Sequence, residues 1–370
     1  LLYQVATSGL EPSSISFPLR KVFQKKRNVI IRMAHVSAIS PNTKTVHTDI
    51  GEIQYDYLVL AQGATTNYYN NSRLQKHAFP MKSVSEALML RNNLLQNFEL
   101  ALNAMNREQR NALLNVVIVG GGPTGVELAG AIAEMKKKIL PKDYAELNFR
   151  HMHIYLLEAA PGLLNGMHAK LGKAVQTYTG TAVKDYDGET VMLSNGETIG
   201  SHTLIWAAGV RGVIIPGIPE DTVAANGRLF VNEYNNLKGL NDIYAIGDIA
   251  LMQDDTYSKG HPQVAQVAIQ QAVLLARNLE KKESGKPLIS FKYNNKGSMA
   301  TVGRNLAVAE IGKLKLKGFF AWVIWMMVHL MSIIGIKKRL FVLINWVWQY
   351  ITYDQSLRLI IKPSLKNIQK

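Results

Sequence analysis

Hydrophobic positions in the first third of the chain alternate between short strand-like runs and one long helix-like stretch. Three runs predict strands: residues 28–35, 44–48 and 55–61. A turn is expected at 50–52. Apolar residues at helical spacing from Ser83 to about Arg110, opened by the capping box Ser83-x-x-Glu86, predict one long helix. Strands alternating with helices in this way are typical of an α/β fold.

The most informative stretch is NVVIVGGGPTGVELAG at residues 115–130, where an apolar strand runs into a glycine-rich turn and then a helix expected at 124–139. The G-x-G-x-x-G spacing falls on Gly120, Gly122 and Gly125. The first glycine allows a sharp turn, the second lets the backbone approach a pyrophosphate, and the third lets the helix pack closely on the strand. With the unpaired N–H groups of the helix N-terminus, this pattern predicts a dinucleotide site.

Further alternation follows the glycine-rich turn. We expect strands at 152–158, 203–207, 228–234 and 242–248, a hairpin-like stretch at 185–199 and a helix at 263–279. The strand TLIWA ends in Ala208-Gly209 much as LVLAQGA ends at 58–64. Two strands that each end in a turn of small residues indicate two related nucleotide-binding units. The simplest topology inserts one unit into the other.

The expected fold class is therefore α/β, with two Rossmann-like dinucleotide-binding domains, one inserted in the other, and a C-terminal amphipathic helical region. Four segments make up this organisation. They are 1–111 and 226–312 for the two parts of one domain, 112–225 for the inserted domain, and 313–370 for the C-terminal region.

Charge is concentrated at the C-terminus. The 370 residues carry a formal net charge of +15, and residues 313–370 hold ten Lys or Arg and one acid, Asp354. Such an excess favours a polyanionic partner, either nucleic acid or an anionic membrane surface. The basic tail has no nucleic-acid-binding signature and its aromatic residues stand in apolar runs, so a membrane is preferred.

The tail contains an uncharged apolar segment, residues 318–336, flanked by lysine and arginine. As one helix it would span about 28 Å, which allows a transmembrane helix. A helix lying in the membrane interface fits better, because Trp322 and Trp325 stand in mid-segment and Gly335 is expected to end the helix. We expect Phe319, Phe320 and the two tryptophans to contact lipid. An ordinary buried helix is the third alternative.

The absence of cysteine limits the chemistry. With no cysteine in the chain, it has no disulfide, zinc–cysteine site, iron–sulfur cluster or redox dithiol. The nine histidines are scattered without a metal-binding spacing, so no metal site is expected.

Four polar positions stand where chemistry is expected. Glu158 ends the strand after the glycine-rich helix, where an acid bonds the adenosine ribose and favours NADH over NADPH; a solvated acid is the alternative. Glu127, in the first helical turn, contacts the nicotinamide or relays a proton, unless it merely complements the helix dipole. Gly247-Asp248 binds a sugar hydroxyl or caps a turn. Gln266 is polar among apolar neighbours, although an exposed helix glutamine is the simpler interpretation.

Eight motifs in sequence resemble the type II (alternative) NADH:quinone oxidoreductases over nearly the whole chain. They are LLYQVATSGLEPSSISFPLR, YDYLVLAQGATTNYY, VVIVGGGPTGVELAGAIAE, TLIWAAGV, DIYAIGDIA, GHPQVAQVAIQQA, GSMATVGRNLAV and GFFAWVIWMMVHLMSIIG. The family is a flavoprotein with two dinucleotide sites that attaches to one side of a membrane through its C-terminal region. It passes a hydride from NADH to FAD and two electrons to a quinone without pumping protons.

The resemblance implies roles for particular residues. NADH would be held by Gly120, Gly121, Gly122, Gly125, Glu158, Ala208 and Gly209. FAD would be held by Thr7, Gln62, Gly63, Gly247, Asp248, Val264 and Ala265. Gln266 and Ile269 would face the quinone, and Glu127 and Gln266 would be catalytic. The expected partners are a membrane quinone and an anionic lipid surface but no nucleic acid, and a homodimer is left open. The expected location is a membrane surface facing NADH, the cytoplasmic side in a bacterium.

Two departures from the family pattern stand beside this likeness. The family begins with its own G-x-G-x-x-G for FAD, which this sequence does not contain, so weak FAD binding is expected. Residues 166–185 form a shorter connection than in the family. Two other functions therefore stay open: a soluble NADH-dependent flavin reductase acting on oxygen or a carrier protein, and a non-enzymatic NAD-binding paralogue.

Overall fold

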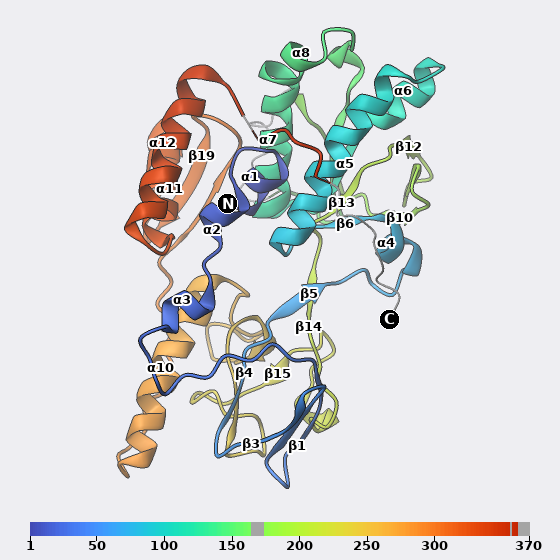
Figure 1. The fold of residues 1–370 in the computed structure, drawn as a ribbon. Helices are drawn as coiled ribbons and strands as arrows, with labels where there is room; N and C mark the ends of the chain where they lie inside the picture. The colour runs from blue at the N-terminus through green and yellow to red at the C-terminus, as the bar shows by residue number, and fades with distance from the viewer. Residues whose placement is uncertain (164–173, 356, 362–370) are drawn as a thin grey trace. The chain divides into compact units, whose positions relative to one another are not determined.

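The computed structural model describes residues 1–163, 174–355 and 357–361 and divides into two compact units (Figure 1). Unit 1 contains Leu1–Val22, Tyr68–Gly209 and Gly297–Lys370, and unit 2 contains Phe23–Asn67 and Val210–Lys296. The stretch 164–173, within the connection predicted to be short, lies outside the described residues. The two units do not coincide with the four segments predicted from the sequence, and the assignment of those segments to domains stays a prediction.

Unit 1 is built around a parallel five-stranded sheet, as the strand–helix alternation predicted. The strand order is β6 (Phe79–Pro80), β13 (Leu204–Trp206), β7 (Val116–Val119), β8 (Ile154–Glu158) and β9 (Gln176–Thr179). All four residues of β7 are buried: Val116 and Ile118 lie in the main hydrophobic core, and Val117 and Val119 lie in a second core with Tyr186 and Val191 of an antiparallel sheet. Helix α7 (Pro123–Lys138) follows β7 and turns Val126, Leu128 and Ile132 into the main hydrophobic core.

The long helix expected from Ser83 to about Arg110 is two helices, so that prediction is wrong at its C-terminal end. Helix α5 (Val84–Leu102) begins with the predicted capping box, in which Ser83 accepts a bond from the Glu86 N–H and Glu86 accepts one from the Ser83 N–H. The helix ends at Leu102. Its C-cap, Asn103, has a φ of −98° and a ψ of 6°, which are not helical values. Asn106 then caps a second helix, α6 (Arg107–Leu114), by accepting a bond from the Gln109 N–H.

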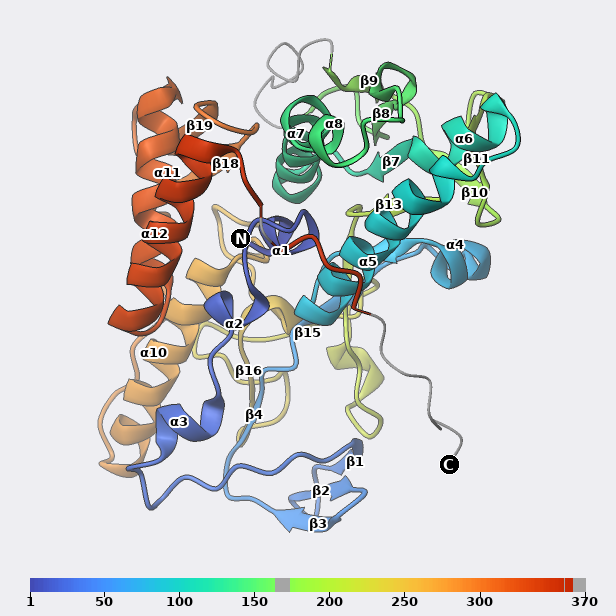
Figure 2. The ribbon, with the colours of Figure 1, turned by 45° about the horizontal axis from the view of Figure 1, so that its top comes forward.

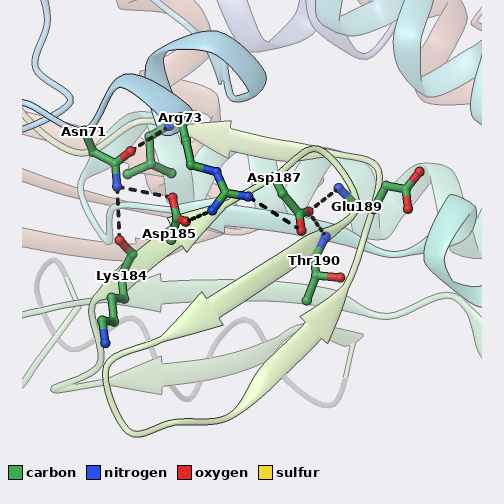
Figure 3. Close-up of polar contacts among 8 residues, drawn as sticks. Asn71, Arg73, Lys184, Asp185, Asp187, Glu189 and Thr190 are labelled. Carbon is green, nitrogen blue, oxygen red and sulfur yellow. Dashed lines mark hydrogen bonds and ion pairs between the residues drawn. The ribbon is translucent and has the colours of Figure 1, made fainter.

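The predicted hairpin is a three-stranded antiparallel sheet made of β10 (Val183–Tyr186), β11 (Thr190–Leu193) and β12 (Thr198–Gly200). Helix α4 (Ser72–His77) is attached to it by polar contacts (Figure 3). Arg73 forms an ion pair of 2.6 Å with Asp185, and the Asn71 side chain donates to the Lys184 carbonyl. Asp187 closes the β10–β11 turn by accepting bonds from the N–H groups of Glu189 and Thr190.

The C-terminal part of unit 1 is an antiparallel sheet followed by two helices that pack against each other (Figure 2). The strands are β18 (Ser298–Thr301), β19 (Ala307–Ile311) and β20 (Leu314–Gly318), and the helices are α11 (Phe319–Ser332) and α12 (Ile336–Thr352). The first helix ends at Ser332, before the expected Gly335, which instead precedes α12 with a φ of 92°. Among the described residues, no helix is both long and apolar enough to cross a membrane.

The described residues of unit 2 form a three-stranded antiparallel sheet and three two-stranded sheets, two of them parallel and one, between β5 (Ala64–Thr66) and β14 (Val210–Gly212), antiparallel. The three-stranded sheet consists of β1 (Val36–Ser40), β2 (Thr45–Thr48) and β3 (Gly51–Gln54). One parallel pair joins β4 (Leu58–Leu60) to β16 (Ile243–Ala245), and α10 (Ala265–Glu283) packs near the end of β16. The other joins β15 (Leu229–Phe230) to β17 (Ala250–Leu251), so the strand expected at 228–234 is shorter than predicted. The strand expected at 28–35 is wrong: that segment is not a strand, and Met33 is 95% exposed, so its apolar side chains lack the packing that stabilises a strand. The turn also comes one residue early, because Gly51 and Glu52 already belong to β3.

Candidate dinucleotide and electron-transfer sites

The turn between β7 and α7 can be formed only by glycines at two of its positions. Gly120 has a φ of 112°, and a Cβ there would lie 2.7 Å from the Ala207 carbonyl oxygen. A Cβ on Gly125 would lie 2.0 Å from the Gly120 carbonyl oxygen, so a side chain would push the helix away from the strand. A Cβ on Gly122 would meet nothing within 4 Å, which leaves space for a ligand at the position assigned to the pyrophosphate.

The N-terminus of α7 offers donors to that space. Its first residue is Pro123 and its N-cap is Gly122, and no side chain accepts a hydrogen bond from the first turn. The helix dipole adds a partial positive charge at the same end. Open space, unsatisfied N–H groups and a dipole together fit a diphosphate.

Glu158 stands beside this turn at the carboxyl end of β8. Its Oε2 accepts a hydrogen bond of 2.5 Å from the Gly121 N–H, and its Oε1 accepts one of 2.8 Å from the Ala160 N–H. The carboxylate is therefore held against the glycine-rich turn, which differs from a solvated acid at a strand end. A dinucleotide lying on this turn would pass within reach of the acid that the sequence assigned to its ribose.

The third part of the unit 1 site is the turn after β13. Because β13 pairs with β7 in parallel, Ala208 and Gly209 lie at the same edge of the sheet as Gly120. Gly209 has a φ of 78°, and a Cβ there would lie 2.5 Å from the Tyr69 hydroxyl. Ligands of open α/β sheets bind at this carboxyl edge, which the three neighbouring strand ends now form.

Glu127 is half-buried and accepts two hydrogen bonds, so its environment goes beyond the helix dipole. Its Oε1 accepts hydrogen bonds from Trp325 Nε1–H at 3.2 Å and from the Thr301 N–H at 3.5 Å. Desolvation by burial raises the pKa of Glu127 to about 7, while these hydrogen bonds act in the opposite direction. A carboxyl group with this pKa can hold or release a proton at neutral pH.

Trp325 corrects one expectation of the sequence. It was assigned to lipid contact, but it is 1% exposed and stacks on His329 with ring centroids 4.1 Å apart. Burial lowers the pKa of His329 to about 4, so the ring is neutral near pH 7. The inward side of α11 is therefore part of the surroundings of Glu127, and only its other side faces solvent.

A cavity of about 100 Å³ lies between α7, β18 and the two C-terminal helices. Arg304 lines it and pairs with Glu134 of α7 at 3.1 Å. The same guanidinium donates to the carbonyls of Gln349 and Tyr350 at the end of α12 and lies 3.8 Å from the Tyr353 ring centroid. Arg304 thus joins the end of α12 to α7, a role that its place in a short loop between strands did not reveal.

Unit 2 brings a second group of predicted residues together. β4 and β16 are parallel neighbours, so the turns Gln62-Gly63 and Gly247-Asp248 extend from the same edge. The Gly247 N–H donates to Gln271 Oε1 at 2.7 Å, and Gln263 Nε2 donates to the Asp248 carbonyl at 2.9 Å. Gln263 precedes α10 and Gln271 lies within it, so this helix holds the Gly247-Asp248 turn in place. Gln271 was missed because nothing in the motif GHPQVAQVAIQQA distinguishes it from Gln270 beside it.

The N-terminus of α10 carries the residues assigned to the flavin ring and the quinone. Val264 is its N-cap and Ala265 its first residue, and no side chain caps this end either. Gln266 Oε1 accepts a hydrogen bond of 3.0 Å from the Lys296 N–H, and Ile269 is 63% exposed. These four residues and the two turns beside them belong to unit 2. The NADH residues, Glu127 and the buried Thr7 belong to unit 1.

Two carboxyl edges of parallel strands, each with glycine turns and a helix N-terminus without a side-chain cap, are the features expected of a protein with two dinucleotide sites. Comparison with known proteins gives the family. Residues 1–272 match the model of the pyridine nucleotide-disulphide oxidoreductases, and residues 295–352 match the NDH2 C-terminal domain.

Relatives and solved structures agree with these models. The chain is 35% identical over 376 aligned positions to the type II NADH:quinone oxidoreductase Ndh of Mycobacterium tuberculosis, covering 95% of this chain and 80% of that protein. It is 28% identical to the external NADH-ubiquinone oxidoreductase 2 of Saccharomyces cerevisiae, with 95% and 74% covered. The structure of NDH2 from Plasmodium falciparum in complex with NADH shares the fold, with a TM-score of 0.86, 21% identity and coverage of 98% and 92%.

The chain belongs to the type II NADH:quinone oxidoreductases. This confirms the expected α/β architecture with two dinucleotide-binding units. Family membership supports the quinone-reducing function over the soluble flavin reductase and the non-enzymatic paralogue.

Proposed function

We propose that this protein oxidises NADH and reduces a membrane quinone, with FAD as the intermediate carrier, and that it pumps no protons. The observation that carries this proposal is the carboxyl edge of the unit 1 sheet. There Gly120, Gly122 and Gly125 open a space at the uncapped N-terminus of α7, and Glu158 is bonded to the same turn. This arrangement supports binding of a nicotinamide dinucleotide without a 2′-phosphate.

FAD supplies an electron sink that takes a hydride and gives up two electrons. The turns at Gln62-Gly63 and Gly247-Asp248 fit the ribityl and phosphate portion of FAD. Gly63 and Gly247 have φ values of 71° and 73°, which favour glycine, and a glycine leaves the backbone there without a side chain. The uncapped start of α10, at Val264 and Ala265, offers backbone N–H groups to the flavin ring. Thr7 is the least supported of the assigned FAD residues, since its hydroxyl donates to the Tyr3 carbonyl.

The chain's own chemistry restricts where the electrons go. Many two-nucleotide flavoenzymes pass electrons through a pair of cysteines, but this sequence has no cysteine. Electrons must therefore leave for an acceptor directly. A quinone also takes up two protons when it is reduced, and Glu127, with a pKa of about 7, is suited to relay one of them.

Attachment to a membrane is supported by the exposed side of the two C-terminal helices. On α12, large apolar side chains recur at helical spacing and are 49–82% exposed: Ile336, Leu340, Ile344, Val347 and Ile351. On α11, Phe320, Met327 and Met331 are 59–74% exposed. Exposed apolar side chains on two helices that pack against each other suit a protein that lies on a bilayer without spanning it. The enzyme would face the compartment that holds NADH.

The assignment of Gln266 separates the two halves of the reaction. Gln266→Leu should raise the KM for quinone several-fold, because the side-chain amide that would contact the quinone is lost. Flavin reduction by NADH, followed in a stopped-flow instrument, should keep its rate. Gln270→Leu, on the same helix, is the control. Slower flavin reduction in Gln266→Leu would show that Gln266 takes part in the reaction with NADH and contradict its assignment to the quinone.

A further inference from the structure

The first turn of α12 is joined to a segment near the start of the chain. This segment contains α2 (Pro12–Ile15) and the beginning of α3 (Leu19–Phe23). Lys338 Nζ donates a hydrogen bond of 2.6 Å to the Ser13 carbonyl and another to the Ser16 carbonyl. Because carbonyl groups 3 residues apart converge on one ammonium group, the segment is held against α12 without a carboxylate.

Two lysines share one aromatic ring at this junction. Lys338 Nζ lies 4.8 Å from the centroid of the Phe17 ring and Lys21 Nζ lies 5.9 Å from it, so the two ammonium groups are at most about 11 Å apart. Lys337, the next cation, is exposed. Neither residues 12–22 nor residues 331–352 contain an acid, and Glu11 is the nearest one along the chain. Clustered cations repel one another and favour an anion between them.

The cations are bordered by apolar side chains that face solvent. Leu19 is 62% exposed and Val22 is 44% exposed, and Ile336 at the start of the α12 stripe is 82% exposed. A phosphate site alone would not need such side chains. Exposed aliphatic residues next to clustered lysines are the combination that an anionic bilayer binds, with the acyl region taking the apolar groups and the headgroups taking the charges.

We propose that Phe17, Leu19, Lys21, Ile336, Lys337 and Lys338 form a headgroup patch that binds the phosphates of an anionic phospholipid bilayer. The membrane-binding surface would then consist of two parts of the sequence more than 300 residues apart. This inference rests on the membrane attachment proposed above and adds the segment of residues 12–22 to the surface that contacts anionic lipid. The Lys338 hydrogen bonds hold the segment that carries Phe17 against the first turn of α12.

The test is co-sedimentation of the full chain with phosphatidylcholine vesicles that contain or lack phosphatidylglycerol. Each lysine near an anionic surface strengthens binding about fivefold, so the double variant Lys21→Gln/Lys337→Gln should bind the anionic vesicles about 25-fold more weakly. Its binding to pure phosphatidylcholine should not change. Both lysines are exposed, so the fold should be kept, which circular dichroism checks.

The matched control is Lys76→Gln/Lys184→Gln, which removes the same charge from exposed positions at α4 and β10. Equal losses in the two double variants would overturn the patch, since only net charge would then matter. An unchanged affinity of Lys21→Gln/Lys337→Gln would overturn it as well. Leu19→Ser should weaken binding to both kinds of vesicle. An unchanged affinity would show that Leu19 does not contact the bilayer. Failure of the proposed function would show separately, as loss of NADH oxidation by a water-soluble quinone in detergent.

Discussion

At the scale of single residues, Glu127 is a carboxyl group whose pKa the fold raises into the neutral range, to about 7. Sequence reasoning placed it in the first turn of the glycine-rich helix but could not foresee its hydrogen-bond partners. The donors to Glu127 are Trp325 and Thr301, which are 198 and 174 residues away along the chain. A tertiary contact over such a distance leaves no local signal in the sequence.

Glu127 makes stability depend on pH in a defined direction. Its folded pKa of about 7 lies above the ordinary 4.5, so between these values the folded state holds a proton that the unfolded state has released. The free energy of unfolding should therefore fall as pH rises through this window. Glu127→Gln should remove this fall, so urea unfolding should show the variant gaining stability relative to wild type from pH 5 to pH 8.

The exposed Glu146→Gln is the control for this measurement. A stability difference between wild type and Glu127→Gln that stays constant over the same pH range would show that Glu127 does not titrate there. The raised pKa would then be wrong.

Glu158 determines which nicotinamide cofactor is preferred. Glu158→Arg replaces a carboxylate that repels a 2′-phosphate by a cation that attracts it, and we expect the ratio of kcat/KM for NADPH to that for NADH to rise about tenfold or more. Glu158→Gln keeps an acceptor for the Gly121 N–H and separates the effect of charge from that of the hydrogen bond. An unchanged ratio in Glu158→Arg would place the ribose elsewhere.

At the scale of elements, sequence patterns worked best where a local rule sets the structure. The capping box at Ser83, the glycine-rich turn after Val119 and the helix that follows it were all predicted from neighbouring residues. The predictions that failed depended on distant packing. The apolar run at 28–35 has no covering layer, and the single helix predicted to reach Arg110 breaks where two asparagines offer caps.

The β10–β11 turn provides a test of local structure in unit 1. Asp187 accepts two backbone hydrogen bonds of 2.9 and 2.7 Å there, and they lower its pKa (Figure 3). Asp187→Ala should lower the free energy of unfolding by about 1 kcal/mol, because the N–H groups of Glu189 and Thr190 would then donate to water instead of the carboxylate. Asp187→Asn, which keeps one acceptor, should lose less. Equal losses in thermal unfolding would show that charge matters more than the turn geometry.

At the scale of the whole molecule, the site residues divide between two units. NADH residues and Glu127 belong to unit 1, and most FAD and quinone residues belong to unit 2. Motif reasoning found both groups because each lies at the carboxyl ends of parallel strands, where glycine turns are visible in the sequence. It did not find Gln271 or Arg304, whose partners are backbone groups that any residue could supply.

The membrane surface is also a property of the whole molecule. Leu340→Ser/Ile344→Ser removes two side chains that are 57% and 56% exposed on α12 and should weaken binding to vesicles about tenfold or more per residue. Met89→Ser/Leu100→Ser, on the exposed side of α5, is the control and should bind as wild type does. If both pairs sediment equally with lipid, α12 does not face the bilayer.

The central claim is that electrons pass from NADH through bound FAD to a quinone with no cysteine taking part. Anaerobic stopped-flow spectroscopy of the full chain, purified with FAD present, tests it most directly. NADH should bleach the visible flavin absorption, and a following mix with quinone should restore it. A protein that stays colourless after incubation with FAD, or a reduced flavin that quinone leaves bleached, would contradict the account.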